Sequence, residues 1–93
     1  MIERDGDTVR VSGALTLATV VSLRDAGAAC LTAGDVMVDL KAVTEVDSSA
    51  LSLLLEWRRE AQRRHLRIRY SNLPSNLTSL AALYGVGEII AGD

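Results

Sequence analysis

Hydrophobic and polar residues alternate in two short segments of the chain. From Thr8 to Ser12 every second residue is valine, and the segment from Leu66 to Ser71 alternates in the same way. Each segment therefore predicts a β-strand with one apolar and one polar face. Asp5-Gly6-Asp7 precedes the first of them and predicts a turn, because glycine tolerates a positive φ. We expect a hairpin from Ile2 to Ser12.

Two longer segments follow a helical period instead. Between Ser49 and Arg64 the apolar residues have the i, i+3, i+4, i+7, i+11 spacing of a core-facing stripe. Its members are Ala50, Leu53, Leu54, Trp57 and Ala61. Upstream, Gly13 is expected to end the first strand and Thr16 to cap a helix over residues 17–32. The predicted buried stripe of that helix is Leu17, Val20, Leu23, Gly27 and Leu31.

The remaining segments complete an alternating order of strands and helices. The apolar run from Val36 to Leu40 is typical of a buried strand, and Pro74 suits the first turn of a short helix that Gly85 closes. The segment from Val86 to Ile90 is an edge strand or a packed turn. We therefore predict one α/β domain over residues 1–93. Its small mixed sheet of about four strands should carry its helices mainly on one face.

Composition narrows the classes of function. The net charge of −2 favours neither nucleic acid nor a membrane as a partner, and aromatic residues are few. The sequence has one cysteine, which excludes an internal disulfide. Because it also has only one histidine, we predict no metal site, and we predict no cofactor. The first residues have no apolar signal core, and no apolar run approaches the length of a membrane span. We expect a cytoplasmic protein without direct membrane insertion.

The strongest candidate for a site is Asp47-Ser48-Ser49, which follows the buried strand and opens the second helix. One interpretation is that Asp47 or a serine caps the helix. The alternative is a regulatory site in which Ser48 or Ser49 is phosphorylated. Catalysis by a serine would need an activating base. The only histidine, His65, lies at the far end of the same helix, about 24 Å away. We therefore predict no catalytic residues and favour a binding or regulatory module.

Charged side chains are concentrated in the second half of the long helix and in the strand after it. This basic group is Arg58, Arg59, Arg63, Arg64, Arg67 and Arg69. Such a group is most often a solvated face, and the alternative is contact with an acidic partner or an anionic lipid surface.

The runs Val36-Met37-Val38-Asp39-Leu40 and Val46-Asp47-Ser48-Ser49-Ala50-Leu51 resemble the STAS domain family, which includes anti-sigma-factor antagonists. The family pattern is an apolar strand ending in Asp-Leu, then Asp-Ser/Thr-Ser/Gly-Gly-Leu at the start of a helix. Ala50 stands where the family usually has glycine. The resemblance covers nearly the whole chain and implies the STAS fold.

Two branches of the family lead to different expectations. In anti-sigma-factor antagonists, a partner kinase phosphorylates the serine that matches Ser49. In the MlaB branch, a non-catalytic subunit binds the MlaF-type ATPase subunit of a phospholipid-transport ABC system. That contact involves an Asp-Thr pair, which Asp47 and Ser48 match. The segments 11–16 and 80–86 are similar to the MlaB branch, which we therefore favour.

The MlaB resemblance implies a location on the cytoplasmic side of the inner membrane, held there through the partner. The expected partner-binding residues are Asp47, Ser48, Ser49, Ser52, Glu56 and Arg59. The alternative is an anti-sigma-factor antagonist that meets a serine kinase and an anti-sigma factor. In that case Ser49, or its neighbour Ser48, is the phosphoacceptor.

Overall fold

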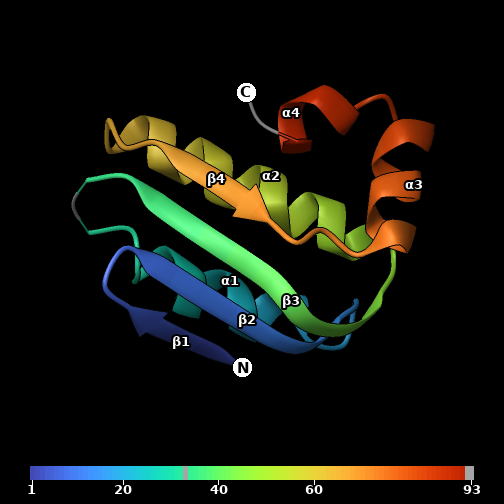
Figure 1. Ribbon diagram of the computed structural model, residues 1–93, viewed down its shortest axis with the longest axis horizontal. Coiled ribbons are helices and arrows are strands. Elements are labelled where there is room, and N and C mark those ends of the chain that lie inside the picture. Colours follow the sequence, from blue (N-terminus) through green and yellow to red (C-terminus); the bar gives the residue numbers. More distant parts are fainter. Residues whose placement is uncertain (33, 92–93) are drawn as a thin grey trace.

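The computed structural model describes residues 1–32 and 34–91, which form a sheet backed by helices (Figure 1). The strands are β1 (Ile2–Asp5), β2 (Thr8–Leu15), β3 (Val36–Val46) and β4 (Ile68–Ser71). The helices are α1 (Val20–Ala28), α2 (Ser48–Arg63), α3 (Ser75–Leu83) and α4 (Gly87–Ala91).

The sheet is mixed, and its strands lie in the order β1-β2-β3-β4. β1 is antiparallel to β2, whereas β2, β3 and β4 are parallel. In the view of Figure 1 the strands lie in front of α1 and α2, which pack side by side. The predicted α/β class, with a small mixed sheet and helices mainly on one face, is confirmed.

The hairpin at the start of the chain is confirmed, with Gly6 at a φ of 62° in the turn. The expectation that Gly13 ends the strand that begins at Thr8 is wrong, because this strand, β2, continues to Leu15. Gly13 lies inside the strand at a φ of 88°, next to a shift in the β2–β3 register. Glycine allows this conformation, so the strand bends there without ending.

β3 is longer than the apolar run that predicted it, since it extends beyond Leu40 to Val46. Its pairing with β2 shifts at two places, and at each shift β3 carries one extra residue. Leu40, Val43 and Val46 therefore face the core at a spacing of three residues, while the residues between them are exposed. These bulges carry the strand to the corner where α2 begins.

α1 is shorter than predicted, and the prediction that Thr16 caps it is wrong. The backbone turns once at Thr16, whose carbonyl accepts from the amides of Thr19 and Val20, and the helix begins after that turn. Leu17, expected in the buried stripe, is 75% exposed. Leu23, near the middle of the same predicted stripe, is buried as expected.

The last segment was expected as an edge strand or a packed turn, and instead it forms α4. Gly85 has a φ of 73° after the end of α3, as the predicted helix stop requires. The chain then reverses into α4, and Ile90 is buried with only 1% of its surface exposed.

α2 is the central element of the helical layer, and its predicted apolar stripe is buried throughout. The indole nitrogen of Trp57 donates to the carbonyl of Arg24 in α1 at 3.1 Å. On the sheet side, the Tyr70 hydroxyl donates to the carbonyl of Leu54 at 2.6 Å. Gly27 of α1 lies against the Trp57 ring, where an added Cβ would be 2.3 Å from ring carbons. Gly27, a member of the predicted stripe, is buried, and its lack of a side chain permits this close packing.

Replacement of Gly27 by alanine should lower the free energy of unfolding by about 1–3 kcal/mol, because the new methyl group overlaps the Trp57 indole. Urea denaturation followed by Trp57 fluorescence measures this change. Gly87→Ala is the matched control, since its Cβ would meet its nearest neighbour at an ordinary 3.8 Å. Equal stability of Gly27→Ala and the unmodified chain would contradict this packing.

Candidate functional site

Asp47 joins the end of β3, the start of α2 and the segment that leads into α1. Its Oδ1 accepts from the Ser49 amide at 2.8 Å, and its Oδ2 accepts from the Leu17 amide at 3.0 Å. Its own amide donates to the Leu15 carbonyl at 3.2 Å. The Leu17 bond is the largest cause that holds the pKa of Asp47 below its ordinary value, against an opposing effect of desolvation. Asp47 therefore fixes the position of Leu17 beside α2.

α2 presents the predicted binding residues on one face. Ser48 and Ser52 are exposed, whereas Ser49 and Glu56 are half-buried. Arg59 donates to Glu56 across one helical turn at 3.0 Å. We call the residues Ser48, Ser49, Ser52, Glu56 and Arg59 the α2 ridge. Asp47 caps the helix at the head of this ridge, so the structure brings all the predicted residues together.

Two grooves flank the α2 ridge. The first lies between α1 and α2 and has a volume of about 420 Å³; Leu17, Val20, Val21, Arg24, Ser49, Ser52, Leu53 and Glu56 line it. The second has a volume of about 330 Å³ and is lined by Ser48, Ser49, Leu51, Ser52, Leu55, Tyr84 and Val86. Ser49 and Ser52 contribute to both grooves, so these serines form the wall between them.

Large apolar side chains are exposed along the outer margins of these grooves. Leu17 and Val21 are 75% and 63% exposed on the α1 side. On the other side Tyr84 is 60% exposed, and its neighbour Leu83 is 78% exposed. Exposed apolar patches bordered by polar groups are typical of protein–protein interaction sites. These margins were not predicted from the sequence, because they come from the segment around the start of α1 and from the end of α3.

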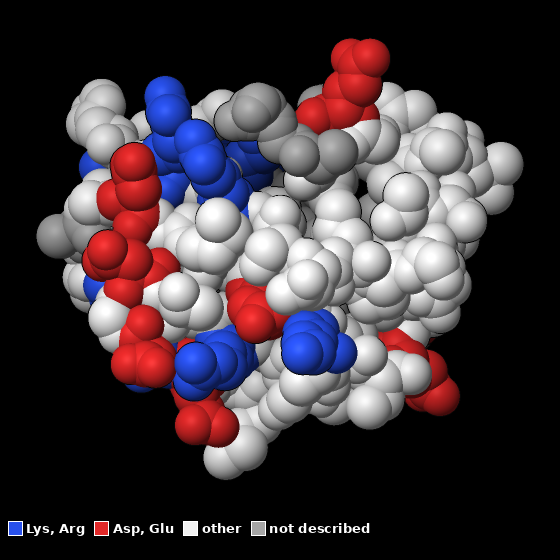
Figure 2. All heavy atoms as spheres, in the orientation of Figure 1, with Lys and Arg blue, Asp and Glu red and all other residues white. Residues whose placement is uncertain are grey.

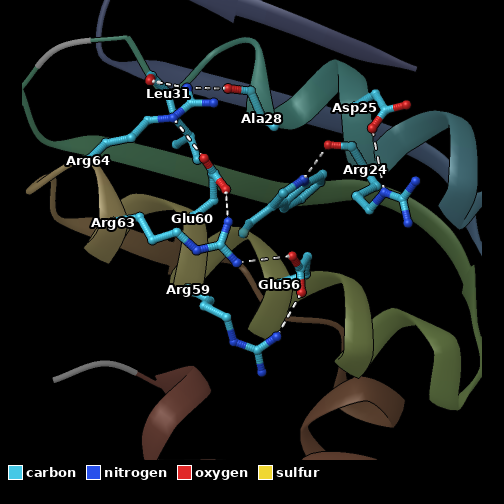
Figure 3. A network of polar contacts seen from close by, with 10 residues as sticks. Arg24, Asp25, Ala28, Leu31, Glu56, Arg59, Glu60, Arg63 and Arg64 are labelled. Carbon is cyan, nitrogen blue, oxygen red and sulfur yellow. Dashed lines mark hydrogen bonds and ion pairs between the residues drawn. The ribbon is translucent and has the colours of Figure 1, made fainter.

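The second half of α2 carries a ladder of ion pairs (Figure 3). Arg63 bridges Glu56 and Glu60, and Arg64 pairs with Glu60 at 3.0 Å. Arg64 also donates to the carbonyls of Ala28 and Leu31, at the C-terminal end of α1. Half of the predicted basic group is therefore paired within the helical layer and is not an excess of free charge.

The single histidine of the sequence lies at the opposite end of α2 from the serines. His65 follows the C-terminal end of α2, whereas Ser48 is its first residue. Within residues 1–32 and 34–91, no cluster of histidine, cysteine or acidic side chains is suited to hold a metal ion. No helix in the same part of the chain has the length and apolar character needed to cross a membrane.

A family model described as "Mlab, STAS domain" matches residues 1–91 of the chain. No curated protein matches it. Among solved structures, the unphosphorylated anti-sigma-factor antagonist SpoIIAA matches with a TM-score of 0.63 and 18% identity, over 82% of this chain and 76% of that one.

Two further structures are similar. A sulfate transporter family protein from Wolinella succinogenes has a TM-score of 0.66 and 14% identity, over 86% of this chain and 66% of that one. The structure of Mglu has a TM-score of 0.62 and 22% identity over 78% of this chain, which spans only 19% of Mglu. At these identities the likeness shows a shared fold.

Replacement of Asp47 by asparagine should lower the urea midpoint at pH 7, because a neutral amide is a weaker acceptor for the Leu17 and Ser49 amides. The pKa of Asp47 is lowered on folding, so its contribution is complete above the ordinary value of 3.8 and is lost as the pH falls through the folded value. The difference between the two proteins should therefore shrink in acid.

Asp25→Asn is the control, because it removes an exposed carboxylate whose contact with Arg24 is 3.5 Å long. It should leave the midpoint unchanged, since such surface pairs contribute little. Equal midpoints for Asp47→Asn and the unmodified chain at pH 7 would show that Asp47 does not hold this corner.

Proposed function

This chain belongs to the STAS domain family, and we propose that it is an MlaB-type subunit of a phospholipid-transport ABC system. In this role it binds the ATPase subunit and has no catalytic step of its own. The match of the MlaB-type family model over residues 1–91 supports this assignment. The partner would hold the chain at the cytoplasmic side of the inner membrane.

The observation that carries the proposal is the uncharged first half of the α2 ridge between two apolar grooves. Ser48, Ser49 and Ser52 are small, so a partner's backbone can approach α2 closely there. The exposed apolar margins on both sides then supply surface to bury, which is the main source of affinity in protein interfaces. We expect the ATPase subunit to cover Leu17 and Tyr84 together.

Asp47 has an indirect role in this proposal. Its bond to the Leu17 amide holds one apolar margin against the head of the ridge. Its bond to the Ser49 amide fixes the first turn of α2 at the same time. The surface is therefore formed before the partner arrives, and little conformational entropy is lost on binding.

The test is co-expression with the ATPase subunit and purification through a tag on that subunit. Ser48→Arg should reduce the recovered complex by at least about tenfold, because a long charged side chain at the centre of an interface loses its hydration on docking. Circular dichroism should show an unchanged fold, since Ser48 is exposed.

Gln62→Arg adds the same charge at an exposed position near the other end of α2 and should leave the complex intact. Failure of the unmodified chain to co-purify would refute the proposed partner. Normal co-purification of Ser48→Arg would place the interface elsewhere on the molecule.

A second candidate is an anti-sigma-factor antagonist that is controlled by phosphorylation of Ser49. The position of Ser49 favours it, because this residue is half-buried in the first turn of α2 and lines both grooves. A phosphate there gains from the helix N-terminus and is repelled by the Asp47 carboxylate. It would obstruct both grooves and so switch off docking of an anti-sigma factor.

Incubation with the candidate serine kinase and ATP, followed by mass spectrometry, tests this second function. The expected product carries one phosphoryl group on Ser49, and Ser49→Ala should stay unmodified. Ser48→Ala is the matched control and should still be phosphorylated. An unmodified mass for the original chain would count against this candidate and leave the ATPase proposal unaffected.

A further inference from the structure

The sheet has an inner face toward the helical layer and an outer face away from it. Val9 and Val38 are buried on the inner face, and Tyr70 reaches the carbonyl of Leu54 in α2 from the same side. Because side chains alternate along a strand, the residues on either side of these point outward. They are half-buried or exposed, and we call them the outer sheet face: Glu3, Asp5, Thr8, Arg10, Met37, Asp39, Arg69 and Ser71.

The strand register arranges these residues in two rows that run from β1 to β4. The members of the first row are Asp5, Thr8, Met37 and Arg69. The members of the second row are Glu3, Arg10, Asp39 and Ser71. The first row therefore has a negative charge at one edge of the sheet and a positive charge at the other. The second row has a negative charge at the β1 edge and a pair of opposite charges at its centre.

Both signs of charge are visible on this face in Figure 2. Lys and Arg atoms lie over the start of β4, Asp and Glu atoms lie toward the β1–β2 turn, and both kinds meet over the middle of the sheet. A partner that carried charges of one sign would be repelled by part of this face. A matching partner must therefore carry both signs in the reverse order.

A second copy of the chain has this reverse order when a two-fold axis runs along the strands, between β2 and β3. The axis lays β1 over β4 of the second copy and β2 over its β3. Asp5 then faces Arg69 of the second copy, and Arg10 faces Asp39 of the second copy. Since such a contact is isologous, each of these attractive pairs occurs twice.

The other two-fold arrangement, with its axis across the strands, does not match. It lays β1 over β1 of the second copy, so that Glu3 and Asp5 meet acidic residues. Like charges placed opposite each other disfavour an interface. We infer that the outer sheet face binds a second copy of this chain, with the strands of the two sheets running in the same direction.

The dimensions of packed sheets allow this contact. Two sheets pack face to face about 10 Å apart, with their strand directions within about 30° of each other. An arginine and a carboxylate side chain can span this distance together. Thr8 and Met37, both half-buried, lie next to the axis and supply the uncharged centre of the contact.

This contact leaves the α2 ridge free, because the ridge belongs to the helical layer. Two chains joined through their outer sheet faces would present two α2 ridges on opposite sides of the dimer. The inference does not depend on the proposed ATPase partner, and its test uses the chain alone.

Sedimentation equilibrium at low ionic strength, with chain concentrations up to about 1 mM, tests the inference in the range where weak contacts are populated. The average mass should rise from that of the monomer toward that of the dimer. Asp5→Arg and Arg69→Asp each place two like-charge contacts in the interface. Each should raise the dissociation constant by at least about tenfold. Circular dichroism should show an unchanged fold, since both residues are exposed.

An equimolar mixture of these two variants is the decisive measurement. In a mixed dimer the new arginine of the Asp5→Arg chain faces the new aspartate of the Arg69→Asp chain. The unchanged Asp5 and Arg69 of the two chains also face each other, so all the pairs are attractive again. The mixture should therefore dimerise with a dissociation constant within about threefold of the original.

Asp25→Arg is the matched control for Asp5→Arg, because it makes the same change of charge at an exposed residue of α1. It should dimerise as the unmodified chain does. A monomeric mass for the unmodified chain at every concentration would overturn the inference. Undiminished dimerisation of Asp5→Arg and Arg69→Asp would overturn it as well, since the copies would then meet through another surface. A mixture of the two variants that stays monomeric would contradict the proposed pairing of the strands.

Discussion

The contact between Trp57 and Gly27 sets the spacing of the two helices on which the proposed docking surface depends. The indole occupies the space that any other side chain at position 27 would need, and its N–H satisfies a carbonyl of the facing helix. α1 therefore lies close to α2, and the exposed residues Val21 of α1 and Leu17 of the segment before it form one wall of a groove. Tyr70 holds the opposite side of α2 against the sheet through the Leu54 carbonyl. The position of the serines follows from this packing.

Much of the fold could be predicted from local patterns. α2 keeps the spacing of its apolar stripe over its whole length, and the β1–β2 hairpin has a glycine turn between alternating residues. The extent of β3 was missed because two bulges interrupt the alternation after Leu40. The start of α1 was predicted too early because Leu17 is an apolar residue at helical spacing. In the structure its amide donates to the Asp47 carboxylate, and the helix begins only at Val20. Neither effect is visible in a window of a few residues.

In the candidate site, too, the residues of a single segment could be predicted, whereas the contribution of distant segments could not. Its polar residues follow one another along a single helix, so one periodic segment was sufficient to group them. Its apolar margins come from segments far apart in the sequence, and only the fold places Leu17 and Tyr84 on either side of α2. One local pattern could have been found. Glu56 precedes Arg59 by three residues, and Glu60 precedes Arg63 and Arg64 by three and four residues, which predicts these ion pairs.

The two edge strands have a consequence for how the protein can be recognised. β1 and β4 are four residues long, and β1 carries Glu3, Arg4 and Asp5 in succession. At the opposite edge of the sheet, α4 packs against β4. Short, charged or covered edges oppose the addition of a foreign strand, which is the common route to amyloid-like stacking and to peptide capture by sheet extension. Recognition by backbone pairing is thereby disfavoured, and specificity is left to side chains.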